Sequence, residues 1–236
     1  MKKESWEVLV GRQVRLFEQR SRGATEQQDR PDMFVTISRQ FGCGGFSLAN
    51  ALAERLNQAV PEKEPHWIAY DRRLILDVAQ QEKLSKDLFE SLDERLRGQV
   101  SDYLESLICG WPDQESIFRK IVRTMVTLAM HGRAILVGRG GAIVTRHLPG
   151  GHHYRLVAPR QHRISQIAAE LGVGQDEAEQ RVDKGDRVRR RLIKEFLTED
   201  VSDSCHYDAV LNTARITQQE MVELIAGRLA RVRNNG

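Results

Sequence analysis

One stretch of this sequence decides its fold class: Met33-Phe34-Val35-Thr36-Ile37-Ser38-Arg39-Gln40-Phe41-Gly42-Cys43-Gly44-Gly45. Residues 33–38 form a short run rich in β-branched and apolar side chains, and residues 47–56 supply strong helix formers at amphipathic spacing. The pattern therefore predicts a strand, a glycine-rich loop and a helix in succession. Such a loop presents unpaired backbone N–H groups and the positive end of the helix dipole, which together suit a phosphate group.

The rest of the chain continues the alternation of strands and helices. We predict further strands over 66–70, 134–137, 153–158 and 207–212. We predict helices over 71–109 (two or more), 116–131, 161–172, 175–196 and 217–233. Residues 134–137 are continuously apolar, as in parallel strands that are buried on both faces. This order predicts an α/β fold with a parallel sheet, helices on both faces and ligands at the carboxyl ends of the strands.

The N-terminal region differs from this core. Residues 1 to about 20 show helical apolar spacing among charges, and residues 21–32 form a polar linker without an apolar period. We therefore expect an appended N-terminal segment over 1–32, made of an amphipathic helix and the polar linker, and a main domain over 33–236. Two roles for the helix stay open at this stage: packing on its own core, or a contact in a homodimer.

Composition limits the possible functions. Apolar residues make up 40% and charged residues 29% of the 236 residues, and no window approaches ~20 uninterrupted apolar residues, so no membrane partner is expected. The three cysteines have no histidine at ligand spacing, so no metal site or disulfide framework is predicted. The charged N-terminus lacks a secretory signal, and we expect a cytoplasmic protein.

The distribution of charge is more informative than its total. The chain has 36 basic and 33 acidic residues, a formal charge of +3, which does not predict a nucleic-acid partner. Residues 181–195 hold seven basic residues against three acidic ones, a local charge of +4. Positive charge is therefore concentrated late in the chain.

Five segments of the chain, in order, match the motifs of one protein family. They are Ile37-Ser38-Arg39-Gln40-Phe41-Gly42-Cys43-Gly44-Gly45, Tyr70-Asp71-Arg72-Arg73-Leu74-Ile75, Val137-Gly138-Arg139-Gly140-Gly141, Arg155-Leu156-Val157-Ala158-Pro159 and Tyr207-Asp208-Ala209-Val210-Leu211-Asn212-Thr213. In these segments the sequence resembles the cytidylate kinase-like family of P-loop kinases, whose first motif is Ile-Ser-Arg-Glu/Gln-Phe/Tyr-Gly-Ser-Gly-Gly. The resemblance implies a three-layer P-loop NTPase-type fold with a helical acceptor-binding insertion over 71–112 and an arginine-rich lid over 160–200. It also implies ATP, Mg²⁺ and transfer of the γ-phosphoryl group to a (d)CMP-like nucleotide.

Two departures from related kinases bear on function. Aligning Ser47 with the threonine of a Gly-Lys-Gly-Thr P-loop puts Gly45 where the phosphate-binding lysine stands. Either Arg39 replaces that lysine, or amides and distant arginines hold the phosphate, or transfer is lost and the protein is a nucleotide sensor. Cytidylate kinases have Gly-Arg-Asp, whereas Arg139 is followed by Gly140 in this chain. They also have Asp-Ser-Gly where this chain has Asp71-Arg72-Arg73. The base specificity therefore stays open, and so does the alternative that the acceptor is not a nucleotide.

The resemblance and the chemistry of phosphoryl transfer together suggest site residues, because transfer requires positioned cations. The candidates for catalysis are Arg39, Arg139, Asp186, Arg189 and Arg190. The candidates for binding the nucleotide are Arg39, Gln40, Phe41, Gly42, Cys43, Gly44, Gly45, Phe46, Ser47 and Arg187. The candidates for binding the acceptor are Asp71, Arg72 and Arg139.

Several candidates also have a structural alternative. The arginines of 186–191 could form a solvated basic helix, and Arg139 could form a salt bridge. Asp71 and Ser47 could cap helices. Cys43 stands where a helix N-terminus could lower a thiol pKa, but we interpret it as a small spacer.

Overall fold

A five-stranded, all-parallel sheet forms the centre of the protein, in the order β2-β3-β1-β4-β5. The computed structural model describes residues 6–23, 32–108, 116–138, 140–197 and 199–235. The strands are β1 (Phe34–Arg39), β2 (Ile68–Tyr70), β3 (Ala134–Val137), β4 (Gly151–Val157) and β5 (Ala209–Asn212). The predicted α/β class with a parallel sheet is confirmed.

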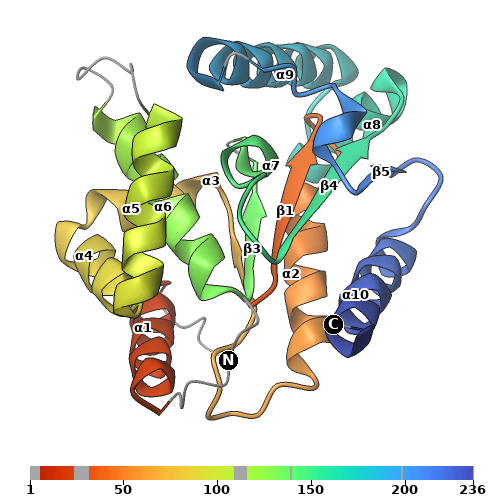
Figure 1. Cartoon of the computed structure of the whole chain (residues 1–236). Helices are drawn as coiled ribbons and strands as arrows, with labels where there is room; N and C mark the ends of the chain where they lie inside the picture. The colour runs from red at the N-terminus through yellow and green to blue at the C-terminus, as the bar shows by residue number, and fades with distance from the viewer. Residues whose placement is uncertain (1–5, 24–31, 109–115, 139, 198, 236) are drawn as a thin grey trace.

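Helices cover both faces of this sheet (Figure 1). Their bounds are α1 (Trp6–Gly23), α2 (Gly45–Asn57), α3 (Arg72–Gln80), α4 (Glu82–Glu90), α5 (Glu94–Ile108), α6 (Ser116–His131), α7 (Gly141–Val144), α8 (Arg160–Leu171), α9 (Gln175–Leu197) and α10 (Gln218–Asn235), with a short 3₁₀ turn η2 (Ser204–His206). The sequence pattern did not indicate α7 or η2, because each is shorter than the window in which helical periodicity can be recognised.

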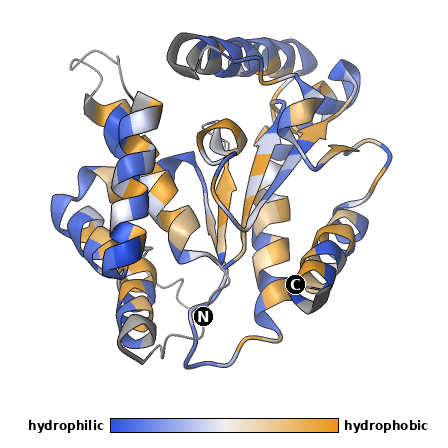
Figure 2. Ribbon diagram, in the orientation of Figure 1, coloured by the Kyte–Doolittle hydropathy of each residue, from blue (hydrophilic) through white to orange (hydrophobic). Residues whose placement is uncertain are grey.

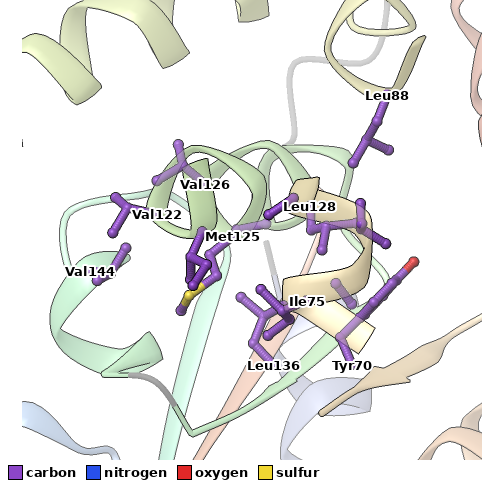
Figure 3. Packing of buried hydrophobic residues seen from close by; sticks show 14 of the residues in the cluster. Tyr70, Ile75, Leu88, Val122, Met125, Val126, Leu128, Leu136 and Val144 are labelled. Atoms are coloured by element: carbon purple, nitrogen blue, oxygen red, sulfur yellow. The ribbon is translucent and has the colours of Figure 1, made fainter. Parts of the chain in front are cut away.

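Strand alternation divides the interior into two apolar layers. Val35 and Ile37 of β1 face α2 and α10, whereas Phe34 faces the other layer. That second layer includes β3, α3 and α6, where Met125 and Leu136 are fully buried (Figure 3). Because β1 lies between both layers and both halves of the sheet, its carboxyl end is the switch point at which α/β folds bind ligands.

The N-terminal helix α1 packs on its own chain. Val10 and Val14 are buried in the same layer as Phe34. The Gln13 side chain accepts a hydrogen bond from the backbone N–H of His66 at 3.1 Å and donates one to the carbonyl of the same residue. Of the two alternatives that the sequence left open, the structure shows this one. Most of the 21–32 linker lies outside the described residues.

Helices α8 and α9 form a separate small layer over the carboxyl ends of the strands. Ile164, Ile167 and Val182 are buried between them. Figure 2 shows α9 as a largely hydrophilic helix, since only a narrow apolar stripe is needed for this contact. The arginine-rich segment thus lies above the edge of the sheet where ligands are expected.

Candidate functional site

A cavity of about 570 Å³ lies between the carboxyl end of β1 and helix α9. The residues that line it are Ser38, Arg39, Gln40, Arg72, Gly138, Gly140, Arg155, Arg160, Arg163, Asp183, Asp186, Arg187, Val188, Arg189, Arg190, Val201 and Ser202. Eight of these are arginines and two are aspartates, which leaves a net charge of +6 among the lining residues. A concave site with this excess of one sign attracts anions strongly.

Arg39 crosses the floor of this cavity. A Cβ atom added at Gly45 would lie 2.8 Å from the Cδ of Arg39, and one added at Gly138 would overlap its Nη1. The arginine therefore runs from the end of β1 past the start of α2 toward the loop after β3. Gly45 and Gly138 leave room for it, so a lysine at position 45 would compete with Arg39 for the same space.

The start of α2 retains the features of an anion-binding helix end. Gly44 is its N-cap residue, with φ of 62°, and no side chain caps the helix. A Cβ added at Gly44 would meet nothing within 4 Å. The first-turn N–H groups have no partner inside the helix and lie at the positive end of its dipole. The loop thus offers amides on its exposed side, while Arg39 lies on the side of the cavity.

An ion pair holds the glycine loop to α8 and α9, the helices of the segment predicted as a lid, which we call the lid. Arg163 of α8 donates through Nη1 to the carboxylate of Asp186 at 2.7 Å and to the carbonyl of Phe41 at 3.0 Å. The other carboxylate oxygen of Asp186 accepts from the backbone N–H of Phe41 at 2.8 Å. The Arg163 side chain is only 7% exposed. Both carboxylate oxygens of the predicted catalytic candidate Asp186 are therefore engaged in these contacts among Arg163, Asp186 and Phe41, which we call the loop clamp. The clamp orients the glycine loop.

The side chain of Phe41 is wedged under α9. A Cβ added at Gly185 would overlap its ring, so α9 needs a glycine at this point. The guanidinium carbon of Arg189 lies 4.9 Å from the centre of the same ring. Burial lowers the pKa of Arg189 from its ordinary value, but an arginine stays charged at neutral pH. The glycine loop and the lid helix thus contact each other directly.

Several predicted candidates make contacts within the protein instead of facing the cavity. Ser47 donates to the Gln218 side chain at 2.8 Å, which joins α2 to α10. Asp71 caps α3 by accepting from the N–H of Leu74 at 2.8 Å, one of the alternatives that the sequence left open. Burial raises the pKa of the Cys43 thiol, which fits its interpretation as a spacer and not as a reactive thiolate.

The other candidates are distributed as follows. Gln40 lines the cavity, but its side-chain oxygen accepts from the N–H of Ala158 at 3.0 Å and so fixes the loop to β4. Arg72, Arg187 and Arg190 line the cavity beside Arg39 and Arg189. None of the predicted nucleotide-binding residues from Phe41 to Ser47 is among the lining residues. Arg139 lies outside the described residues.

Sequence reasoning missed three arginines that line the cavity: Arg155, Arg160 and Arg163. One signal was available for two of them. Arg160 and Arg163 are three residues apart on α8, and their partners Asp183 and Asp186 are three apart on α9. Matching spacings of opposite charge favour pairing between two helices. Arg155 opens one of the segments that resemble the family, but its residue type alone did not indicate that it lines the cavity.

This protein is similar to several known proteins. An uncharacterized protein from Eubacterium ventriosum has a similar fold, with a TM-score of 0.64 and 17% identity over 85% of this chain and 99% of its own. The shikimate kinase from Bacteroides thetaiotaomicron aligns over 86% of this chain and 98% of its own, with a TM-score of 0.41 and 13% identity. Uronate isomerase from Corynebacterium glutamicum is 25% identical over 103 residues, which are 44% of this chain and 20% of that protein.

The chain thus spans about a fifth of the length of that curated relative. None of the helices among the described residues has the length and apolar character needed to cross a membrane. The model of the cytidylate kinase-like family matches residues 34–215, which include the glycine loop, the whole sheet and helices α8 and α9. This protein therefore belongs to the cytidylate kinase-like family.

Proposed function

We propose that this protein is an ATP-dependent phosphotransferase that moves the γ-phosphoryl group to the phosphate of a (d)CMP-like nucleoside monophosphate. The observation that carries this proposal is the net charge of +6 among the residues that line one cavity at the carboxyl end of β1. Phosphoryl transfer requires neutralisation of the charge on two phosphate-bearing substrates, and positioned cations supply it. A cavity of a few hundred Å³ is a common size for a small-molecule site.

The acidic groups in the cavity suit an acceptor that needs no general base. An oxygen of the acceptor phosphate forms a bond to the γ-phosphorus, the bond between that phosphorus and the β–γ bridging oxygen breaks, and ADP leaves. A phosphate monoester is already largely dianionic at neutral pH, so this acceptor needs no general base. Asp183 and Asp186 are both ion-paired to arginines and so are poorly suited to act as bases. This favours a phosphate acceptor over a hydroxyl acceptor.

In this proposal the glycine loop and Arg39 hold the nucleotide. Amides at the start of α2 would bind its phosphates, and Arg39 would supply the positive charge that a P-loop lysine supplies elsewhere. The path of Arg39 past Gly45 supports this replacement. Arg187, Arg189 and Arg190 would neutralise the transferred group from the lid.

The donor set for Mg²⁺ is limited. Within the described ranges no group of three or more His, Cys, Asp or Glu side chains could hold a metal ion. Mg²⁺ commonly keeps several waters and binds through substrate phosphates with one or two carboxylates. The residues present therefore fit an ion held mainly by the nucleotide, which would supply charge neutralisation. Asp183 and Asp186 are the two carboxylates that line the cavity, and both are engaged by arginines.

A coupled assay for ADP tests the proposal. Purified protein is incubated with ATP, Mg²⁺ and each common nucleoside monophosphate, with CMP and dCMP first. Arg72→Ala is expected to lower kcat/KM at least tenfold, because Arg72 lines the cavity. Arg73→Ala is the matched control, since the Arg73 side chain is 90% exposed. The proposal fails if none of the monophosphates raises ADP formation above the rate without acceptor.

A second candidate function is a nucleotide sensor that has lost transfer. Gly45 in the lysine position favours it. Calorimetric titration that detects ATP binding, together with no turnover of any acceptor, would support this alternative. Loss of turnover in Arg39→Ala with an unchanged circular dichroism spectrum would support the kinase.

A further inference from the structure

Arg155 is a charged residue inside the protein that no part of the proposed reaction has used. It lies in β4, opposite Ser38 of β1 in the sheet register, and is 8% exposed. Moving a guanidinium into the interior carries a desolvation penalty unless charges or hydrogen bonds compensate it. The side chains that contact Arg155 therefore decide whether that compensation is complete.

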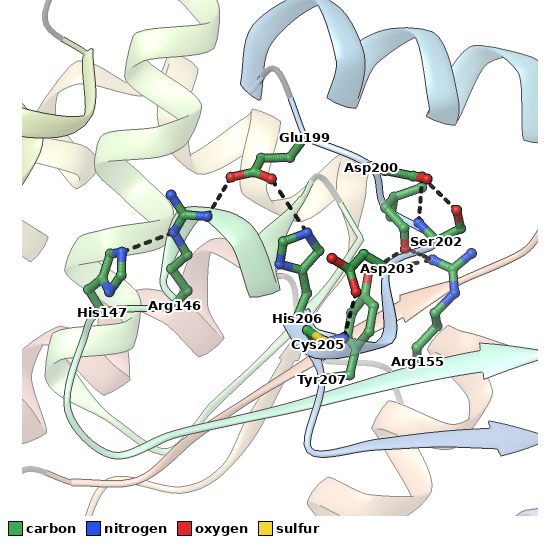
Figure 4. Close-up of polar contacts among 11 residues, drawn as sticks. Arg146, His147, Arg155, Glu199, Asp200, Ser202, Asp203, Cys205, His206 and Tyr207 are labelled. Atoms are coloured by element: carbon green, nitrogen blue, oxygen red, sulfur yellow. Dashed lines mark hydrogen bonds and ion pairs between the residues drawn. The ribbon is translucent and has the colours of Figure 1, made fainter.

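The contacts of Arg155 are all to neutral groups. Nη1 donates to the carbonyl oxygen of Val201 and, at 3.4 Å, to the hydroxyl of Tyr207 (Figure 4). Its guanidinium carbon lies 5.6 Å from the centre of the Tyr207 ring. In the part of the chain that the structure describes, no carboxylate forms an ion pair with it; the nearby Asp200 accepts instead from the N–H and hydroxyl of Ser202.

These contacts also fix the orientation of the guanidinium. The Tyr207 hydroxyl donates to the same Val201 carbonyl at 2.9 Å. The hydrogen bonds among Tyr207, Val201 and Arg155 therefore restrict the rotation of the guanidinium. Both hydrogen bonds of Arg155 leave from Nη1. The donors on Nη2 and Nε remain for a group in the cavity that Arg155 lines together with Val201 and Ser202. A planar pair of such donors matches the two oxygens of a phosphate or carboxylate.

The position of Arg155 differs from that of the glycine loop. Tyr154 and Leu156, its neighbours in β4, face the layer of α2 and α10. Because strand residues alternate, Arg155 projects to the opposite face of the sheet from α2. Amides at the start of α2 and the guanidinium of Arg155 therefore define two separate anion positions.

We propose that Arg155 is a binding residue for the phosphate of the second substrate, on the face of the sheet away from the glycine loop. The identity of that substrate as a nucleoside monophosphate rests on the proposed function, but the anion position does not. A bound phosphate would give this buried guanidinium a direct ion pair, which its longer-range attraction to Asp200 does not supply. Arg155 would thus discriminate the acceptor from ATP.

Calorimetric titrations of the full-length protein test this inference without turnover. CMP, ribose 5-phosphate, inorganic phosphate and ATP are titrated into the wild type, Arg155→Gln and Arg155→Lys. Arg155→Gln is expected to weaken CMP binding by about 10- to 150-fold, the range for a hydrogen bond to a charged group. ATP binding should change less than threefold. Arg155→Lys keeps the charge without the planar pair of donors and should fall between the wild type and Arg155→Gln.

Arg146→Gln is the matched control, because Arg146 is exposed, pairs with Glu199 and does not line the cavity. It should bind every ligand as the wild type does. Equal losses for ribose 5-phosphate and CMP would support the phosphate position and identify a non-nucleotide acceptor. The inference is overturned if both Arg155 variants bind CMP and the other small phosphates with wild-type affinity, or if the wild type binds none of them. Binding that depends on Arg155 in a protein without turnover would refute only the proposed function.

Discussion

The buried ion pair between Arg163 and Asp186 allows a quantitative test of how the lid holds the glycine loop. Asp186→Asn keeps the size of the side chain and removes its charge. The pair is well shielded, with side-chain exposures of 7% for Arg163 and 20% for Asp186. Removing one partner of a buried pair costs about 3–5 kcal/mol, because the remaining charge is left uncompensated.

The expected loss here is smaller than that range. The amide oxygen of the substituted side chain can still accept from the N–H of Phe41, and Arg163 keeps its bonds to the carbonyls of Phe41 and Ala158. We therefore expect the free energy of unfolding to fall by about 2–3 kcal/mol. For a chain of this length that loss lowers Tm by about 4–12 °C.

Asp183→Asn is the matched control for this measurement. Asp183 also lies on α9 and also pairs with an arginine of α8, but its side chain and that of Arg160 are 46% and 47% exposed. Solvent and salt screen such a pair, so no measurable change in stability is expected. Urea unfolding followed by circular dichroism gives both values, and hydrogen exchange at the Phe41 amide reports the local opening. Equal losses in the two variants, or a loss below about 1 kcal/mol in Asp186→Asn, would refute the clamp.

Three further predictions concern backbone space, a helix cap and pH. Gly185→Ala should lower Tm, because the new methyl group overlaps the Phe41 ring of the loop. The control is Gly227→Ala, whose methyl group meets nothing within 4 Å and should raise the free energy of unfolding by about 0.5–1 kcal/mol. Stabilisation by both substitutions would contradict the overlap. Asp71→Ala should cost about 0.5–2 kcal/mol in urea unfolding while Asp71→Asn should not, and a large loss of turnover in the stable Asn variant would instead indicate contact with substrate. Burial lowers the pKa of His152, so the unfolded chain binds a proton that the folded one does not, and stability should fall as pH drops through about 6.5. His152→Phe should flatten that slope and His147→Gln, at an exposed position, should not; an unchanged slope in His152→Phe would refute the assignment.

Local pattern was sufficient for most of the fold. The helix at 116–131 and the strand at 134–137 match the predicted ranges, because unbroken periodicity and a continuous apolar run are strong signals. The strand predicted over 66–70 is shorter in the structure and spans Ile68–Tyr70, because pairing with β3 begins only at Ile68. Strand ends depend on the partner strand, which local sequence does not specify.

The candidate site was predictable only in part. Residue type and order are enough to predict the family, the parallel sheet, the glycine loop at the carboxyl end of β1 and an excess of arginine in the later helices. The contacts of each side chain become known only once the chain is folded. The tertiary structure directs Arg39 into the space beside Gly45, commits Asp186 to the loop clamp and turns Arg155 into the cavity. Asp186 meets Phe41 from 145 positions away, and Arg155 meets Val201 and Tyr207 from 46 and 52 positions away. These contacts form at one edge of the sheet, where burial and charge are set by neighbours that are distant in the sequence and not by the local pattern.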